Sequence, residues 1–212
     1  MARDRLEPSR RGAPILKSVR GDGDGWVVSY RDTYHWGLHG AAGLLLRAPW
    51  HDGTPAVLLQ HRALWSHQGG TWGLPGGALD SHEAAEHAAV REANEEAGLR
   101  AEHIVVRTTV VTAEVSGPEG TWTYTTVVAD ATRLLVTVPN RESAELRWVP
   151  EAQVADLPLH PAFGQSWARL RTTPDVPDHG CGLELPHTVV VGEGVFAWCT
   201  PGEIDRPASV PR

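Results

Sequence analysis

Three glutamates near the middle of the chain have the spacing that places side chains on one face of a helix. Glu92, Glu95 and Glu96 stand at positions i, i+3 and i+4, and residues three and four apart are neighbours on an α-helix. Like charges at this spacing destabilise a helix by roughly 0.2–0.5 kcal/mol per pair, and Arg91 is the nearest basic residue that could offset them. A hard divalent cation such as Mg²⁺ prefers carboxylate oxygens. The spacing therefore indicates a cation-binding face, with an exposed acidic helix as the alternative.

A glycine-rich loop precedes these glutamates. Residues 69–77 read GGTWGLPGG, and glycine allows unusual dihedral angles and a close approach of the backbone to a ligand. A backbone carbonyl from this turn could complete the oxygen shell of a bound cation. The loop and the glutamates together predict a site for a phosphate-bearing ligand and its metal.

The spacing of glycine, arginine and glutamate in this stretch resembles the signature of the Nudix hydrolases, Gly-x5-Glu-x7-Arg-Glu-U-x-Glu-Glu-x-Gly-U, where U is a bulky aliphatic residue. The matching residues are Gly77, Glu83, Arg91, Glu92, Glu95, Glu96, Gly98 and Leu99. Ala93 stands where the family usually has a larger aliphatic residue. That departure bears on helix packing and leaves the chemistry of the signature intact.

The resemblance implies a metal-dependent attack of water on a diphosphate linked to another moiety, with Mg²⁺ or Mn²⁺ as the cofactor. It also implies that Glu92, Glu95 and Glu96 hold the metal and that the carbonyl of Gly76 is a further ligand. Arg91 would orient Glu92, which is itself a candidate general base. The cations would neutralise phosphate oxygens and lower the pKa of the attacking water.

Some relatives use an additional carboxylate, from a loop outside the helix, as a metal ligand or as the base. Glu142 is our candidate, because it lies just ahead of the strand that contains Trp148. Glu145 and Glu114 are the alternatives. A solvated loop glutamate is an equally good interpretation of each of these three.

The segment upstream of the glycine pair resembles MutT-like nucleoside triphosphate pyrophosphohydrolases, which place an Arg and a His at similar distances before the glycines. Arg62 would then contact a base or a phosphate, and His67 would line the pocket; the alternatives are a surface residue at a strand end and an ordinary loop histidine. Trp72 is among the tryptophans near this site that could stack on a base, with Trp36 and Trp65 as the others.

The substrate expected first is a (deoxy)nucleoside triphosphate, cleaved to the monophosphate and pyrophosphate. MutT-like enzymes select an oxidised guanine partly through an Asn in a proline-rich loop after the last strand, and residues 157–161 (LPLHP) contain no Asn. Specificity for 8-oxo-dGTP is therefore not expected. Hydrolysis of nucleotide sugars or ADP-ribose, and a Nudix-fold nucleotide sensor without catalysis, are the alternatives.

The order of strand-like and helix-like segments predicts one α/β (α+β) domain over residues 25–172, and the resemblance implies an α/β/α sandwich around a mixed β-sheet. We expect strands at 41–47, 56–61, 104–115, 121–128 and 145–149, and helices at 81–97 and 163–171. Asp80, with Glu83 three residues later, is the expected N-cap of the first helix, and Gly98 is its expected C-cap. Residues 116–120 (SGPEG) predict a hairpin turn.

The two ends of the chain differ from this domain in composition. Residues 1–24 form a predicted basic arm, most simply a solvated one. Residues 173–212 form a predicted extension with one strand-like run at 188–191, and it is expected to pack on the domain or on a partner subunit. The apolar segments 183–191 and 195–198 must be buried, which together with the habit of the family predicts a homodimer.

The composition excludes several other classes. The 26 acidic residues outnumber the 19 basic ones, giving a net charge of −7, whereas nucleic-acid and membrane-surface proteins favour a basic balance. The two cysteines are too few for a disulfide scaffold or a structural zinc site. We therefore expect reduced thiols, a cytoplasmic location, a nucleotide-type substrate, and neither nucleic acid nor membrane as a partner.

Overall fold

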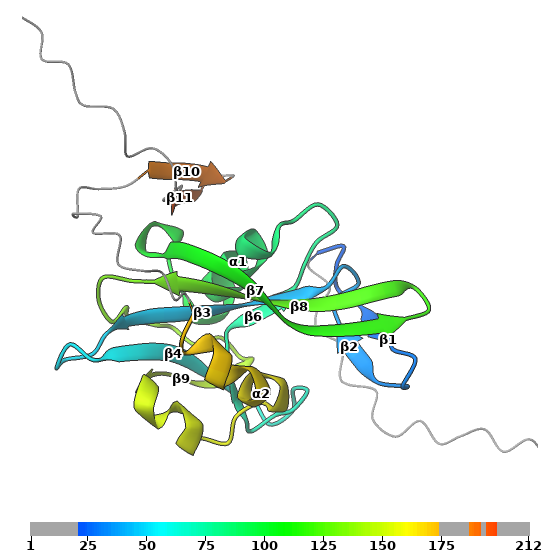
Figure 1. Cartoon of the computed structure of the whole chain (residues 1–212). Helices are drawn as coiled ribbons and strands as arrows, with labels where there is room; N and C mark the ends of the chain where they lie inside the picture. The colour runs from blue at the N-terminus through cyan, green and yellow to red at the C-terminus, as the bar shows by residue number, and fades with distance from the viewer. Residues whose placement is uncertain (1–20, 174–186, 192–193, 199–212) are drawn as a thin grey trace, which may run out of the picture.

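The centre of the structure is a mixed seven-stranded sheet, seen in a computed structural model that describes residues 21–173, 187–191 and 194–198 (Figure 1). Five strands follow one another in the order β5-β4-β3-β8-β7, while β6 pairs with β3 and β9 pairs with β4. The pair β3–β8 is parallel and the other pairs are antiparallel. The strands are β3 (Ala41–Pro49), β4 (Pro55–Arg62), β5 (Trp72–Gly73), β6 (Gly76–Ala78), β7 (Val105–Gly117), β8 (Gly120–Asp130) and β9 (Ser143–Pro150).

Two helices cover the opposite faces of this sheet, α1 (Ala85–Ala97) on one side and α2 (Pro161–Leu170) on the other (Figure 1). The central strand β3 is apolar on both sides, since Leu44 and Leu46 pack in the core under α1 while Leu45 packs in the core under α2. Alternating side chains of a strand point to opposite faces, so a strand buried on both faces has a continuous apolar run. The predicted α/β/α sandwich and its mixed sheet are confirmed.

The two helices bury different kinds of side chain. Small residues of α1, Ala88, Ala89 and Ala93 among them, are completely buried against β3, and small side chains let a helix lie close to a sheet. In contrast, α2 buries Phe163 and Trp167, one helical turn apart. Ala93, which departs from the family signature, is thus part of the close contact between α1 and the sheet.

The predicted helix start at Ser81 is wrong, because α1 begins at Ala85 after an extended Ala84. Asp80 and Glu83 form a separate turn in which the Glu83 amide donates to the Asp80 carbonyl (3.0 Å). The Glu83 carboxylate is bound by Arg91 and also accepts from the Asp80 amide (3.3 Å), whereas Oδ1 of Asp80 accepts from the Gly23 amide. The predicted C-cap is confirmed, since Gly98 has a φ of 67° and its amide donates to carbonyls of the last turn.

Three further features border this core. A hairpin of β1 (Trp26–Val28) and β2 (Tyr34–Trp36) forms a separate two-stranded sheet, and the predicted turn between β7 and β8 is confirmed by the pairing of Gly117 with Gly120. The other two features are short 3₁₀ helices, η1 (Ala101–His103) and η2 (Glu151–Asp156).

Within the described ranges, no helix is both long and apolar enough to span a membrane.

The predicted tails are described only in part. Residues 1–20 of the predicted arm lie outside the described residues, as do Cys181 and Cys199. Of the predicted extension, β10 (His187–Val191) and β11 (Gly194–Trp198) are described as an antiparallel hairpin. The strand-like run predicted at 188–191 lies within β10.

Candidate active site

A cleft of about 370 Å³ opens beside α1, and we call it the acidic cleft. It is formed by the end of the N-terminal segment, the turn after β6, the helix α1 and the loop before β9. Six acidic and two basic residues are among those that line it. The lining residues are Gly21, Asp24, Ala78, Asp80, Arg91, Glu92, Glu95, Glu96, Asn140, Arg141 and Glu142.

Three of the glutamates of α1, Glu92, Glu95 and Glu96, line this cleft, as their spacing predicts. Glu92 and Glu96 are buried, with 7% and 3% of their surface exposed, whereas the Glu95 side chain is one-third exposed. Burying two carboxylates costs free energy unless they are paired or hydrogen-bonded. Their burial therefore indicates that the surrounding residues, or a bound ligand, must compensate their charge.

The glycine loop packs directly on these buried carboxylates. The Gly76 amide donates a hydrogen bond to Oε2 of Glu96 (2.9 Å). A side chain at Gly77 would overlap the Glu92 carboxylate in its present position, so the glycine lets the loop pack directly on this carboxylate. The loop thus approaches the carboxylates of α1 closely, and the backbone of Gly76 lies next to the predicted metal ligands.

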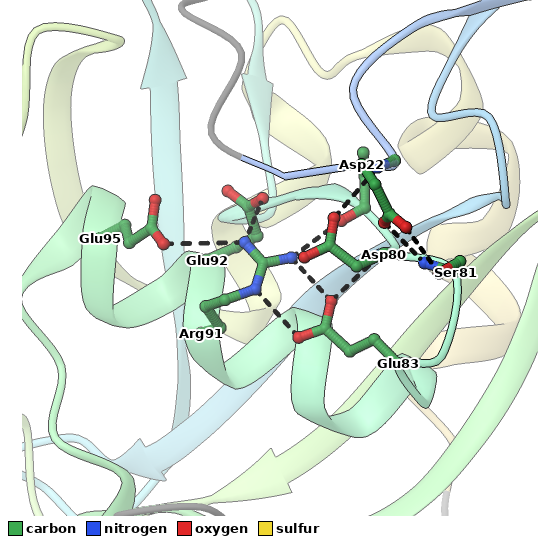
Figure 2. Close-up of polar contacts among 9 residues, drawn as sticks. Asp22, Asp80, Ser81, Glu83, Arg91, Glu92 and Glu95 are labelled. Atoms are coloured by element: carbon green, nitrogen blue, oxygen red, sulfur yellow. Dashed lines mark hydrogen bonds and ion pairs between the residues drawn. The ribbon is translucent and has the colours of Figure 1, made fainter.

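Arg91 connects the glutamates to the turn that precedes the helix (Figure 2). Its guanidinium binds both carboxylate oxygens of Glu83 (2.9 and 2.8 Å) and donates to the Ala78 carbonyl (2.9 Å). It also contacts Glu92 (3.0 Å) and Glu95 (3.7 Å). The hydrogen bond with Glu83 and the nearby carboxylates raise the pKa of Arg91, so it stays charged and fixes the orientation of Glu92.

The structure separates the three candidates for an additional carboxylate. Glu142 lines the acidic cleft, and its backbone is fixed because its amide donates to Oδ1 of Asn140 (2.8 Å) and its carbonyl accepts from the Ala63 amide (3.0 Å). Glu145 instead forms an ion pair with Arg147 (2.7 Å). Glu114 is an exposed residue of β7. Of the three, Glu142 alone is a lining residue of the cleft.

Arg62 and His67 lie close together at the end of β4. Nε of Arg62 donates to the His67 carbonyl (3.0 Å), and the His67 ring packs edge-on against Trp26 with ring centres 6.0 Å apart. Burial, the charge of Arg62 and the neighbouring His35 lower the pKa of His67.

Trp72 lies in a different environment from the other two predicted substrate-binding residues. It is 5% exposed and belongs to the core under α2. Its ring stacks on His61 (4.7 Å), and the Arg147 guanidinium lies 4.7 Å from its centre. These contacts indicate a structural residue, and they give no support to the prediction that Trp72 stacks on a base.

Several residues near Arg62 were missed by sequence reasoning. Burial and the charges of Arg62 and His67 lower the pKa of His160 to about 4. We call His35, His67 and His160, together with Arg62, the histidine cluster. They come from β2, the loop after β4, the residue before α2 and the end of β4, so no local sequence pattern could have grouped them.

Tyr124 is a buried phenol that interacts electrostatically with residues of both regions. A side chain at Gly43 would overlap its hydroxyl group, so the absence of a side chain there makes room for the phenol. Burial raises the pKa of Tyr124, the charge of Arg62 lowers it, and the charges of Glu96 and Glu92 raise it.

The donor chemistry of the acidic cleft fits a hard divalent cation. Glu92, Glu95 and Glu96 offer carboxylate oxygens, the donors that Mg²⁺ and Mn²⁺ prefer. In the described part of the chain, no three acidic, histidine or cysteine side chains already converge as a coordination shell, because Arg91 and the Gly76 amide hold the carboxylates. Cation binding would thus replace some of these contacts.

The sequence is similar to known proteins over most of its length. The family described as "NUDIX domain" matches residues 37–170. The chain is 68% identical over 198 residues to "Putative 8-oxo-dGTP diphosphatase 3" of Mycobacterium tuberculosis, covering 91% of both proteins. It is 36% identical to a "Nucleoside triphosphate pyrophosphatase/Nudix hydrolase fusion protein" of Bifidobacterium longum, covering 80% of this chain and 37% of that protein.

Solved structures of Nudix proteins share the fold of this chain. The crystal structure of a Nudix hydrolase from M. smegmatis, RenU, is 69% identical, with a TM-score of 0.71 over 73% of this chain and 98% of that one. A C. elegans Ap4A hydrolase in a binary complex has a TM-score of 0.51 at 19% identity, over 63% of this chain and 95% of that one. The second likeness shows the fold alone.

Proposed function

Because the chain belongs to the Nudix hydrolase family, whose members hydrolyse phosphoanhydride bonds, we propose that it cleaves (deoxy)nucleoside triphosphates to the monophosphate and pyrophosphate. The observation that carries this proposal is the acidic cleft, where the glycine loop and Arg91 hold two buried glutamates of α1. The name of the mycobacterial relative, "Putative 8-oxo-dGTP diphosphatase 3", supports this substrate class.

Nudix hydrolases use divalent metal ions, and we propose Mg²⁺ or Mn²⁺ here. Glu92, Glu95 and Glu96 would hold the metal, with the carbonyl of Gly76 as a further ligand. Bound there, the metal would neutralise phosphate oxygens and lower the pKa of the attacking water. Removing it with a chelator is expected to abolish turnover.

The residues of the chain then orient the reactants and accept a proton. Water attacks one phosphorus atom of the anhydride between the α and β phosphates, and the bond from that phosphorus to the bridging oxygen breaks. The leaving group, which is pyrophosphate for attack at the α phosphorus and the nucleoside monophosphate for attack at the β phosphorus, departs with the bonding electrons. Glu142 accepts the proton of the water in this proposal, with Glu92 as the alternative. Arg91 keeps Glu92 in one orientation by holding it beside Glu83, which limits the conformations that must be excluded before reaction.

The histidine cluster supplies contacts to the substrate in this proposal. Arg62 is a charged donor for a phosphate or a base edge, and His67 and Trp26 offer ring surfaces beside it. His160, whose pKa is about 4, presents a neutral imidazole near pH 7. It occupies the proline-rich loop in which MutT-like enzymes carry an Asn, so it is the residue most able to take over a contact to the base.

The test is a phosphate-release screen of the full-length protein with Mg²⁺ and added pyrophosphatase. The substrates are the (d)NTPs, 8-oxo-dGTP, nucleotide sugars, ADP-ribose and dinucleotides, and a Glu95→Gln variant runs beside the wild type. Turnover of (d)NTPs or 8-oxo-dGTP that is absent in the variant would support the proposal. Turnover restricted to nucleotide sugars or ADP-ribose, or binding without turnover, would overturn it in favour of the alternatives.

The ratio of kcat/KM for 8-oxo-dGTP to that for dGTP decides the remaining question of specificity. A ratio near one would agree with the absence of an Asn from residues 157–161, whereas a large ratio would agree with the name of the mycobacterial relative. The choice between Mg²⁺ and Mn²⁺, the cytoplasmic location, the homodimer and the absence of a nucleic-acid partner stay predictions from the sequence.

A further inference from the structure

The segment Gly21–Gly25, here called the strap, lies along the turn that leads from β6 to α1 (Figure 2). Asp22 accepts hydrogen bonds from both the amide (2.9 Å) and the hydroxyl group (2.6 Å) of Ser81. The Gly23 amide donates to Oδ1 of Asp80 (3.1 Å). The bonds from Ser81 lower the pKa of Asp22, because they stabilise its ionised carboxylate.

The sequence of the strap, GDGDG, alternates in a way that this packing explains. A side chain at Gly21 would overlap the Asp80 carboxylate, and one at Gly23 would overlap the Leu79 carbonyl. The aspartates between the glycines have other contacts, Asp22 with Ser81 and Asp24 in the lining of the acidic cleft. The strap is therefore fitted to this turn, and it forms one wall of the cleft.

The turn under the strap is also the support of the arginine that orients the glutamates. The Ala78 carbonyl accepts a hydrogen bond from Arg91 (2.9 Å), and the Asp80 amide donates to Oε2 of Glu83 (3.3 Å). Glu83 in turn binds Arg91 through both oxygens. A continuous series of contacts thus connects the strap to Glu92 and Glu95.

We propose that Asp22 is a positioning residue of the acidic cleft. Its two hydrogen bonds with Ser81, here called the clasp, hold residues 78–83 where Glu83 and Arg91 can fix the cation-binding glutamates. This inference rests on the proposed metal-dependent hydrolysis. The turn lies outside α1, which begins at Ala85, and within it the Glu83 amide donates to the Asp80 carbonyl in a bond that spans three residues. Loss of the clasp would let the turn sample other conformations and would lower the fraction of molecules that are ready to bind the metal.

The test compares three variants of the full-length protein. Asp22→Ala removes the clasp, and Asp22→Asn retains an oxygen that can accept from the Ser81 amide. Asp52→Ala is the matched control, because Asp52 makes the same pair of bonds to Thr54 (2.9 and 2.6 Å) in the turn between β3 and β4. The measurements are Mn²⁺ affinity by electron paramagnetic resonance without nucleotide, hydrogen exchange of residues 78–84, and kcat.

The expected result is that Asp22→Ala weakens Mn²⁺ binding and lowers kcat by about 10-fold each, the effect of losing a residue that supports metal ligands. Exchange at residues 78–84 should rise as well. Asp22→Asn should recover most of the loss, and Asp52→Ala should leave Mn²⁺ affinity and kcat unchanged.

The proposal is overturned if Asp22→Ala keeps wild-type Mn²⁺ affinity and exchange, or if Asp52→Ala shows the same losses. Failure of the proposed function looks different, since the wild type would then hydrolyse no nucleoside triphosphate. The Mn²⁺ and exchange measurements would still decide the role of Asp22 in that case.

Discussion

The acidic cleft takes three of its carboxylates from one helix, whereas the histidine cluster takes its four side chains from four separate segments. In the cleft, charged groups are held by ion pairs and by the backbone of the glycine loop. In the cluster, burial lowers the pKa of three imidazoles beside a single arginine. We infer from this difference that the local motif carries the reaction and the non-local cluster carries the choice of substrate.

The largest effect is expected from a comparison of two variants, one that removes a carboxylate inside the acidic cleft and one that removes a carboxylate outside it. Glu96→Gln is expected to lower kcat by about 10³-fold, because a metal ligand worth several kcal/mol of charge stabilisation is lost. Its Tm should change little, since the amide oxygen of Gln can still accept from Gly76. Glu145→Gln, which breaks an ion pair outside the cleft, is the control and should keep wild-type rates. Equal rates in both variants would contradict the assignment of Glu96.

A second comparison tests the loop carboxylate within the cleft. Glu142→Gln should lower kcat by about 100-fold and remove the acidic limb of the pH–rate profile, as loss of a general base does. Glu114→Gln, in an exposed position on β7, should change kcat by less than about 2-fold. If Glu142→Gln retains the acidic limb, the proton acceptor is another group, with Glu92 the first candidate.

A third comparison separates substrate contacts from packing. Arg62→Ala should raise KM for a nucleoside triphosphate by roughly 10-fold with little change in kcat, because a charge-assisted hydrogen bond to the bound substrate is lost. Trp72→Leu should instead lower the free energy of unfolding by about 2 kcal/mol and leave KM near the wild-type value. If Trp72→Leu raised KM without lowering the free energy of unfolding, the result would support the prediction that Trp72 contacts the substrate.

The smallest effect concerns stability in acid. The pKa of His160 falls from 6.5 to about 4 on folding, so the unfolded chain binds more protons between these values and stability falls as the pH is lowered from about 6.5 towards 4. His160→Gln should reduce this loss by on the order of 1 kcal/mol after solvent screening, a shift in Tm of about 2–4 °C at pH 5. The measurement is the fall in Tm between pH 8 and pH 5 in each protein. An equal fall in the wild type and in His160→Gln would show that the pKa of His160 is not lowered by folding.

The grouping of the three glutamates follows from local sequence spacing, because a helix fixes which neighbours share a face. The i, i+3 and i+4 spacing placed Glu92, Glu95 and Glu96 together, and the glycine pair before them marked the loop that packs on the carboxylates. Gly98 marked the end of the helix for the same local reason. The start of the helix was misjudged, because the capping pattern of Asp80 and Glu83 is also satisfied by a turn whose carboxylate binds Arg91.

Tertiary packing determines which residues from elsewhere in the chain meet the helix. It placed Glu142 in the cleft and Glu145 outside it, although the two are three residues apart. It buried Trp72 under α2, and it laid Gly21–Gly25 against a turn nearly 60 residues away in sequence. Such contacts depend on the register of the sheet and on the paths of loops, which are set by the packing of the whole domain. Local sequence spacing therefore does not predict these contacts.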